Sequence, residues 1–536
     1  MKIPYKILYS NDATNLISCV SPFHKKGEPF RPEMLEASVD ETVNTGIDVH
    51  LFQPGLTVVP WWKSKLYPYA EHIKWFEATY GASTRDNPYA AYMLNGGDMV
   101  EVFVKRCRLK GIAPFISLRM NDSHGKEFVN GPLRNPDGSV KTEIGEIPGF
   151  ALHCISRFYK EHPEYRIDPD PSMMNWNDRV LNWAIPEVRE RIFGFITEIC
   201  TQYDIEGLEL DFMRSTNYFR QQETTSDERA GIMTDFVSRV RRLLDSTTRE
   251  NGHRWLCVRV PAYLEGMDRL GLDLPALIEA GVEMVNVSSS YFTVQGTGFP
   301  RIRKVCHGAS VYDETTHTIM TSYTVDDADT NVRKGYDEFL FRRTTPEQFY
   351  TTAYLSYARG GDGMSAFNFA YYREHGGPGR GPFSEPPFYV FKGMKDRDWL
   401  SKQPQHYFLA QYKVDPAREG MPLPREILPG KANSFVFDMA PPQDGWKGVG
   451  KVRIEAKSDM GESAWHATLN GADLEETPDR SEPYPDPFPA LLGRPDEYRA
   501  WKVPASILRD GANVLRVVLR SGTKSYVLRY VDLAIS

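Results

Sequence analysis

Two carboxylates spaced two residues apart are the first sign of chemistry in this sequence. They lie in residues 204–214, where Leu208 and Leu210 alternate with Glu209 and Asp211. An alternation with a period of two is typical of a β-strand whose two faces differ in chemistry. One face of the predicted strand is apolar, and the other face carries both acids.

A third acid is expected on a later strand. Residues 308–317 and 319–325 both have the composition of a strand, and we choose 308–317 because its small and β-branched residues suit a helix-facing side. This choice turns Glu314 inward and Asp313 outward. A shift of one residue in register would exchange them. Asp211 and Glu314 are therefore the predicted pair of carboxyls for general acid, base or nucleophilic catalysis.

The segments around these acids predict alternating strands and helices. Residues 186–203, directly before the first acidic strand, form an amphipathic pattern with proline in the first turn. Further strands are predicted at about 7–19 with its loop, 47–53, 112–124, 255–261, 285–291 and 364–370. Further helices are predicted at 31–43, 98–110, 226–247, 272–281 and 345–359. This order predicts an α/β fold, a (β/α)8 TIM barrel whose active face lies at the carboxyl ends of its strands.

Polar residues on the inward face of the predicted strands complete the candidate site. Seven side chains alternate along their strands with apolar residues that face the helices, so we predict that they point into the lumen. They are Arg119, Asn121, Glu209, Arg259, Asn286, Tyr312 and Asn368. In this prediction Asn368 lies between two outward phenylalanines. A buried arginine needs a partner, which the lumen acids would supply. With Arg214, which follows the first acidic strand, these residues are the predicted substrate-binding set.

Paired tryptophans add a further candidate. Trp61 and Trp62 lie in an irregular loop after the second strand, and aromatic residues make up 12% of the chain. Aromatic rings commonly stack on pyranose rings, so both are included as substrate-binding candidates. Packing within the loop explains them equally well.

Composition excludes several classes of partner. The 64 Lys and Arg against 71 Asp and Glu leave a net charge of −7, which offers no basic field for nucleic acid or an anionic membrane. No apolar run is long enough to cross a bilayer. Six scattered cysteines indicate reduced core residues, and no metal or other cofactor is expected. As written the chain is expected in the cytoplasm, or in the periplasm or outside the cell if a signal peptide has been removed.

The carboxyl-terminal quarter of the chain changes character. From about residue 405 the helical signal disappears, and short alternating strands are separated by turn residues. This pattern predicts a smaller all-β sandwich. We therefore expect a catalytic barrel over residues 1–400 and an accessory β-sandwich over 401–536.

Nearly the whole chain resembles TIM-barrel proteins of the family 10 glycosyl-hydrolase-like group. The resemblance is carried by residues 186–190 and 203–214, 310–314 and 357–369, and residues 501–515 resemble a galactose-binding-like sandwich. It implies a glycoside hydrolase whose carbohydrate substrate binds at the barrel mouth. Retaining barrels of this kind place an acid/base on strand four and a nucleophile on strand seven, which implies Asp211 and Glu314 in these roles. α-Glycosidase barrels instead keep an aspartate nucleophile on strand four.

Two other function classes remain open. A catalytically silent carbohydrate-binding barrel is one, although an idle lumen would be more stable with apolar side chains in place of buried charge. A metal-dependent hydrolase or isomerase is the other, with His50 and His124 as candidate ligands, but no metal-binding spacing supports it. If Glu314 is not the second acid, Glu265 and Asp326 are the next candidates. Sugar identity, exo or endo action and the oligomeric state stay open.

Overall fold

The structure is a computed structural model that describes the chain except residues 1–2, 13–22, 24–27, 86, 133–138, 140–150, 170–177, 249–251, 296–297, 322–341, 374–384, 412–421, 487–491 and 522–523. Eight parallel strands close into a barrel in the order β1-β10-β7-β6-β5-β4-β3-β2. They are β1 (Ile7–Asn11), β2 (Val49–Phe52), β3 (Ala113–Arg119), β4 (Gly207–Asp211), β5 (Trp255–Pro261), β6 (Met284–Ser288), β7 (Ser310–Thr316) and β10 (Gly363–Phe367). The predicted (β/α)8 barrel is confirmed, and so is the choice of 308–317 as its seventh strand.

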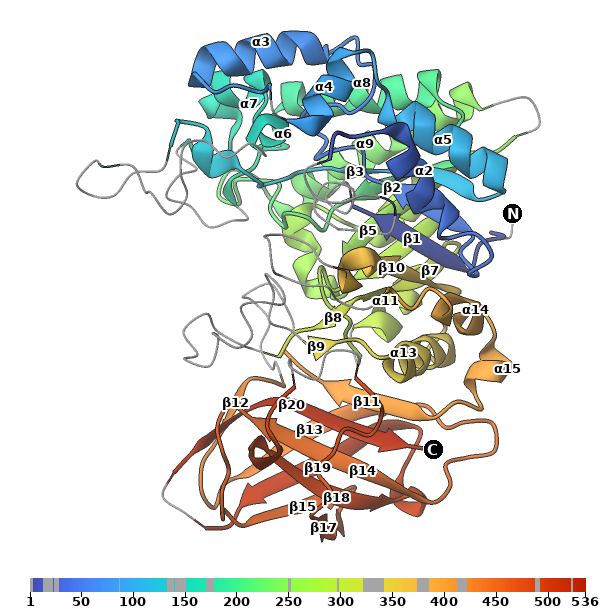
Figure 1. Cartoon of the computed structure of the whole chain (residues 1–536), viewed down its shortest axis with the longest axis vertical. Helices are drawn as coiled ribbons and strands as arrows, with labels where there is room; N and C mark the ends of the chain where they lie inside the picture. The colour runs from blue at the N-terminus through green and yellow to red at the C-terminus, as the bar shows by residue number, and fades with distance from the viewer. Residues whose placement is uncertain are drawn as a thin grey trace.

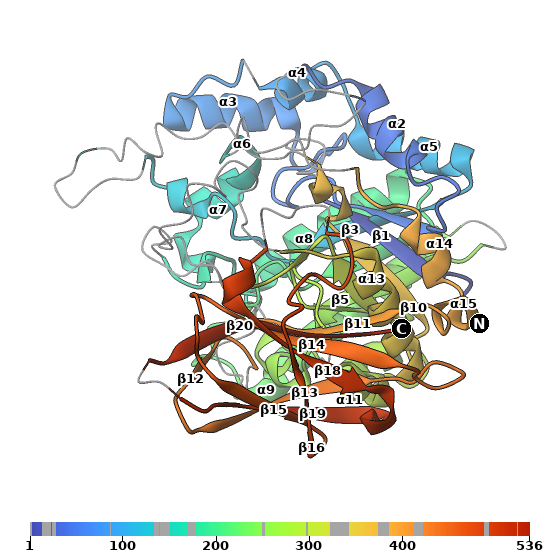
Figure 2. The same cartoon turned by 60° about the horizontal axis from the view of Figure 1, so that its bottom comes forward.

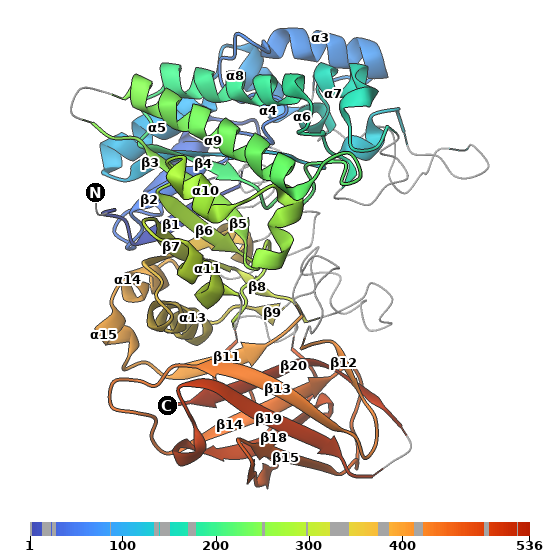
Figure 3. The same cartoon turned by 180° about the vertical axis from the view of Figure 1, so that it is seen from behind.

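Helices surround the barrel (Figures 1 and 3). The helices between successive strands include α2 (Pro32–Asp40), α5 (Met99–Lys110), α8 (Pro186–Gln202), α9 (Ser226–Thr247), α10 (Leu274–Glu279), α11 (Phe299–Val305) and α13 (Pro346–Ala358). Capping boxes begin α9 at Thr225 and α13 at Thr345, and Pro186 opens α8. These signals are local, so the sequence places the helices accurately.

Additional helices lie outside the regular alternation. They are α3 (Tyr69–Tyr80), α4 (Pro88–Leu94), α6 (Ala151–Cys154), α7 (Arg157–Glu161), α14 (Val390–Met394) and α15 (Arg397–Leu400). Figure 2 shows α3 and α4 on the side of the barrel away from the β domain. They belong to the long connections after β2 and so build up one side of the barrel.

The two faces of the barrel strands bury different sets of side chains. Outward residues such as Leu208 and Leu210 of β4 pack in one cluster with Phe195 and Ile196 of α8. The inward residues near the amino ends of the strands form an apolar floor inside the barrel: Leu8, Val49, Leu51, Phe115, Trp255, Cys257, Met284 and Tyr312. The charged side chains therefore lie above a floor of packed apolar side chains.

A short antiparallel ladder interrupts the connection between β7 and α13. Its strands are β8 (Thr318–Ile319) and β9 (Arg342–Arg343). Figure 1 places this ladder between the barrel and the β domain. The ladder therefore carries Arg342 toward the second domain.

The carboxyl-terminal domain consists of two antiparallel sheets. One contains β11 (Gln405–Leu409), β12 (Arg425–Ile427), β14 (Val449–Ala456), β17 (Glu476–Thr477), β18 (Tyr498–Pro504) and β20 (Tyr526–Ile535). The other contains β13 (Ala432–Met439), β15 (Trp465–Leu469), β16 (Ala472–Asp473) and β19 (Gly511–Leu519). Both sheets contribute to one apolar cluster, and the predicted smaller all-β domain is confirmed.

The barrel and the β domain share buried contacts. Apolar residues of α13 and α14 belong to the same cluster as the core of the sheets. Gln348 of α13 donates a hydrogen bond to the Tyr530 hydroxyl at 2.8 Å, and Arg342 pairs with Glu482 at 2.9 Å. Burial of apolar and paired polar groups at one boundary is typical of domains that fold against each other.

Neither a membrane span nor a disulfide is found in the described part of the chain. Its helices are too short or too polar to cross a bilayer. Five cysteines are buried free thiols, namely Cys107, Cys154, Cys200, Cys257 and Cys306. Their burial agrees with the prediction of reduced core residues.

Candidate active site

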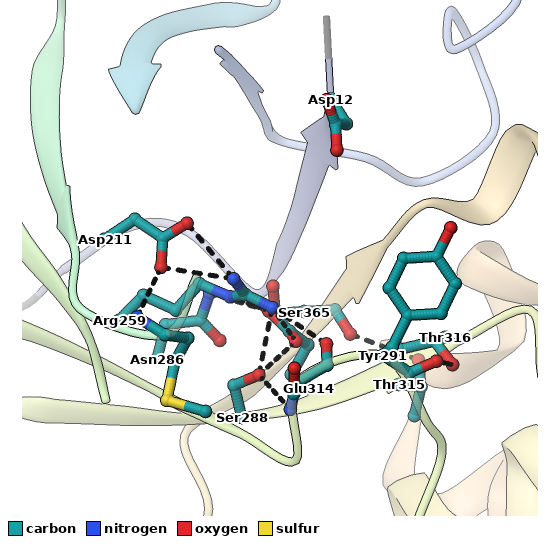
Figure 4. A network of polar contacts seen from close by, with 12 residues as sticks. Asp12, Asp211, Arg259, Asn286, Ser288, Tyr291, Glu314, Thr315, Thr316 and Ser365 are labelled. Atoms are coloured by element: carbon teal, nitrogen blue, oxygen red, sulfur yellow. Dashed lines mark hydrogen bonds and ion pairs between the residues drawn. The ribbon is translucent and has the colours of Figure 1, made fainter. Parts of the chain in front are cut away.

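A single guanidinium group joins the two predicted catalytic carboxyls (Figure 4). Arg259 donates from Nε and Nη2 to the two oxygens of Glu314, at 2.7 Å each. Its Nη1 atom lies 3.1 and 3.2 Å from the oxygens of Asp211. All three side chains are buried, so their charges interact in a medium of low dielectric constant.

The register of the strands brings these groups together. Asp211 at the end of β4 is paired with Arg119 on β3 and with Arg259 on β5. Glu314 lies on β7, separated from β5 by β6, and the long Arg259 side chain spans that distance. Because parallel strands end at the same edge of the barrel, acids from β4 and β7 meet there.

The strand-seven register is as predicted. Glu314 faces the lumen, whereas Asp313 faces away and lines a small space with Thr352 and Ser356 of α13. Burial and the neighbouring Glu314 raise the pKa of Asp313 to about 8. Asp313 is therefore a buried acid outside the lumen.

Both carboxyls of the pair are fully hydrogen-bonded. Glu314 also accepts from the Ser288 hydroxyl at 2.5 Å and from the Asn286 amide at 3.3 Å. Asp211 also accepts from the Met213 backbone N–H at 2.8 Å and from the Gln53 amide at 3.1 Å. Each carboxylate thus accepts four hydrogen bonds, from four donor atoms at Glu314 and from three at Asp211, which match the lone pairs that a carboxylate offers.

The electrostatics of this pair balance burial against pairing. Burial raises the pKa of Glu314, while Arg259 and Ser288 oppose that rise. Burial disfavours the charged form of Arg259 as well, but Asp211 and Glu314 together raise its pKa. Arg259 is therefore a permanent cation at this site.

Glu209 lies beside Asp211 and Glu314. Among the described residues it makes no hydrogen bond to Arg259. It accepts from the Ser117 hydroxyl at 2.7 Å and from the Asn286 amide at 3.1 Å, and the Cys257 thiol lies 3.6 Å away. Burial first, and then the charge of Asp211, raises the pKa of Glu209 to about 7.

A second charged cluster surrounds Arg119. Its Nη2 and Nη1 atoms contact Asp12 at 2.5 Å and Asp122 at 2.9 Å. Asp122 accepts from Nδ1 of His124 at 2.8 Å, and Arg214 donates to Nε2 of the same ring. These contacts select the neutral Nδ1–H tautomer of His124, whose pKa burial lowers to about 4.

Several predicted substrate-binding residues lie apart from the Arg259 pair. The side chain of Asn121 binds the carbonyls of Leu181 and Asn217, so it ties loops together. Tyr312 does face the lumen, but it belongs to the apolar floor and donates to the backbone of Tyr5.

The paired tryptophans are also remote from the charged network. Trp61 and Trp62 are each 1% exposed. Trp61 stacks on Tyr89 and donates to His153, whereas Trp62 donates to Glu198 of α8 at 3.0 Å. Their contacts are those of loop packing.

The predicted side-chain orientations on β10, the eighth strand of the barrel, are wrong. Phe367 faces the lumen, where the Arg259 guanidinium lies 4.1 Å from the centre of its ring, rather than facing outward. Asn368 follows in the left-handed conformation with a φ of 52°, which ends the alternation of the strand. Its amide is buried, and neither amide atom has a hydrogen-bond partner among the described residues.

Other functional candidates were missed by sequence reasoning. They are Asp12, Gln53, Asp122 and Ser288, which contact Arg119, Asp211 or Glu314. All but Ser288 follow directly or within three residues of a strand's last residue. Their position in the sequence could have identified them, because residues just beyond the carboxyl end of a barrel strand face the site. Parity gave no signal for Gln53 because the inward residues before it on β2, Val49 and Leu51, are as apolar as the outward ones.

The structure offers no metal centre among the described residues. No group of three His, Cys, Asp or Glu is arranged there to hold an ion. His50 faces outward between Tyr9 and Phe103, and burial lowers its pKa to about 3. Of the reserve acids, Glu265 pairs with Arg301 on the surface, and Asp326 lies outside the described residues.

Comparisons with known proteins give only distant structural similarity at low sequence identity. No family model and no curated protein matches the chain. Similar solved structures include a noncanonic maltogenic α-amylase AmyB from Thermotoga neapolitana (10% identity, 98% of each chain, TM-score 0.34). They also include a putative α-L-fucosidase from Bacteroides thetaiotaomicron (9% identity, 98% of this chain and 94% of that chain, TM-score 0.34). A third is AmyP in complex with maltose (9% identity, 96% of this chain and 97% of that chain, TM-score 0.36). Likeness at this level leaves the functional argument to the geometry of the site, and the resemblance to the family 10-like group stays a prediction.

Proposed function

We propose that the barrel is a glycoside hydrolase that cleaves an oligo- or polysaccharide with Asp211 and Glu314. The observation that carries the proposal is the Arg259 guanidinium, which joins carboxyls from the carboxyl ends of β4 and β7 in a buried site. Two carboxyls on opposite sides of a scissile bond are the usual requirement of glycoside hydrolysis.

The unequal pairing supports different roles for the two acids. Glu314 receives two guanidinium N–H groups at 2.7 Å, whereas Asp211 shares one guanidinium nitrogen at more than 3 Å. The stronger pairing favours an ionised Glu314, which suits a nucleophile. The acid/base role is assigned to Asp211 because it has the longer contacts to the guanidinium.

In the proposed retaining reaction, protonated Asp211 gives its proton to the glycosidic oxygen as that bond breaks. Glu314 forms a bond to the anomeric carbon, and Asp211 then removes a proton from the water that hydrolyses this ester. Since every lone pair of Glu314 is engaged, one donor such as Ser288 or Asn286 must turn away before attack. The carbohydrate substrate and the accessory role of the β domain belong to the same proposal.

The test is hydrolysis of a panel of aryl glycosides and oligosaccharides by the wild type and two amide variants. Asp211→Asn and Glu314→Gln preserve volume, so we expect a loss of several orders of magnitude in kcat/KM with an unchanged circular dichroism spectrum. Asp313→Asn removes an adjacent buried acid that faces α13, and it is the matched control. Near wild-type activity of Glu314→Gln would exclude Glu314. Proton NMR of the first product reports retention or inversion.

A non-catalytic carbohydrate-binding barrel is the second candidate. It is favoured by the complete hydrogen bonding of Asp211 and Glu314, which leaves neither carboxyl a free lone pair. Calorimetric binding of an oligosaccharide that the wild type does not cleave over days would support this function over hydrolysis.

A further inference from the structure

The charges in the barrel lumen do not balance if every acid is ionised. Glu209, Asp211 and Glu314 surround the single guanidinium of Arg259. The other lumen arginine, Arg119, is already paired with two carboxylates, Asp12 and Asp122. Buried charge without a partner costs several kcal/mol, so a proton is favoured on an acid that has no charged hydrogen-bond donor.

We propose that Glu209 is the acid that holds this proton and that, as a positioning residue, it keeps Asn286 in place on Glu314. This inference rests on the proposed function. Glu209 is fully buried, and its hydrogen-bond donors are the uncharged groups of Ser117, Asn286 and Cys257. Asp211 and Glu314 each accept hydrogen bonds from the guanidinium of Arg259, whereas Glu209 accepts none from it among the described residues.

The surroundings of Glu209 include ionisable groups from four strands. Asp211 lies two residues further along β4, Arg259 and the Cys257 thiol come from β5, Arg119 from β3 and Glu314 from β7. Asp211 opposes ionisation of Glu209 and Arg259 favours it. Arg119 is already neutralised by Asp12 and Asp122, so it supplies no free counter-ion, and Glu314 carries charge of the same sign as an ionised Glu209.

The link to the reacting groups is one amide nitrogen. Nδ2 of Asn286 donates to Glu209 at 3.1 Å and to Glu314 at 3.3 Å. An ionised Glu209 is a stronger acceptor, so it draws this amide away from Glu314. It also adds a negative charge that competes with Glu314 for Arg259. Loss of the Glu209 proton therefore disturbs the alignment of Glu314 by Arg259 and Asn286.

The first test uses Glu209→Gln and does not depend on hydrolysis. Infrared difference spectra between acid and alkaline pH report the carbonyl band of a protonated carboxyl. We expect the wild type to lose such a band around pH 7, and we expect Glu209→Gln to lack it. Asp313→Asn is the matched control, because it removes the band of another buried acid that titrates at about pH 8. An unchanged spectrum in Glu209→Gln overturns the inference.

The second test measures thermal unfolding of Glu209→Gln and the wild type as a function of pH. The pKa of Glu209 is raised in the folded state, so its contribution to stability is present below the unfolded value of about 4.3 and is lost as pH rises through about 7. The Tm of Glu209→Gln relative to the wild type should therefore rise by about 2 °C or more between pH 5 and pH 8.5. A constant difference over this range overturns the inference.

The kinetic test separates this inference from the proposed function. If the wild type hydrolyses a glycoside, kcat/KM should fall as pH rises through about 7, and Glu209→Gln should move that limb upward by at least about one pH unit. Asp313→Asn should leave the limb in place. A Glu209→Gln variant as inactive as Asp211→Asn at every pH would make Glu209 a catalytic acid and overturn the positioning role.

The inference can still be tested if the protein cleaves no glycoside or if Glu209→Gln does not fold. If no glycoside is cleaved, the proposed function fails, whereas the infrared and thermal results still decide where the proton lies. If Glu209→Gln does not fold, Ser117→Ala replaces it. That variant removes the 2.7 Å hydrogen bond to Glu209 and must shift the infrared midpoint, and an unshifted midpoint overturns the inference.

Discussion

Arg259 is the residue on which the charge balance of the candidate site depends. It supplies the positive charge for Asp211 and Glu314, and all three side chains are buried. Replacing it by methionine would leave two buried carboxylates without a cation. We expect Arg259→Met to lower the free energy of unfolding by about 3–5 kcal/mol, measured by urea titration.

The control for this loss is a double variant. Adding Glu314→Gln to Arg259→Met removes one of the stranded charges, so it should restore at least about 1 kcal/mol. If Arg259→Met were as stable as the wild type, the carboxyls would have to be protonated or solvated without the guanidinium. The buried pairing described above would then be wrong.

At the scale of elements, β10 pairs with β1 to close the barrel, and this pairing requires a glycine at residue 363. A Cβ atom on Gly363, the first residue of β10, would collide with the carbonyl oxygen of Lys6, which accepts the hydrogen bond of Met364. A backbone oxygen in a hydrogen-bonded strand cannot turn aside. We expect Gly363→Ala to lower the free energy of unfolding by at least about 2–3 kcal/mol in urea titrations.

Gly231 supplies the matched control for this substitution. It lies within α9, and a Cβ atom there would meet no atom within 4 Å. Gly231→Ala should raise stability by up to about 1 kcal/mol, because alanine loses less backbone freedom in a helix than glycine does. A loss at Gly231 as large as that at Gly363 would refute the steric explanation.

At the scale of the whole molecule, the barrel and the β domain stabilise each other. Apolar residues of α13 and α14 share a buried cluster with both sheets, and Arg359 pairs with Asp438 across the boundary at 2.6 Å. A chain ending at residue 404 would expose this surface. We expect such a chain to aggregate on expression, as judged by the soluble fraction and by gel filtration.

The full-length Arg359→Gln variant is the control for the truncation. The Arg359 side chain is 20% exposed, so its loss should cost only about 1 kcal/mol and leave the protein soluble. A chain ending at residue 404 that unfolds with a sharp thermal transition would show the barrel to be independent. In that case the β domain would be accessory in stability as well as in chemistry.

The sequence by itself determined which elements form and which face of most strands turns inward. Helix caps and prolines are local signals, and they located α8 and α13, whereas helix-prone composition located α9. The contrast between Leu208 or Leu210 and the two acids of β4 oriented that strand, because the lumen at that height is polar. The same contrast distinguished Glu314 from Asp313 on β7.

Only the tertiary structure decided which of these residues meet. Parity gives the face of a strand but not the height in the barrel, so Tyr312 turned inward yet lies on the apolar floor. Parity also fails where inward residues are as apolar as outward ones, as at Val49 and Leu51 of β2 and at Phe367 of β10. This hid Gln53 and misplaced Phe367. The partners of Arg259 depend on the register of β4, β5 and β7, which are distant in sequence. The closed barrel imposes that register, and no local pattern encodes it.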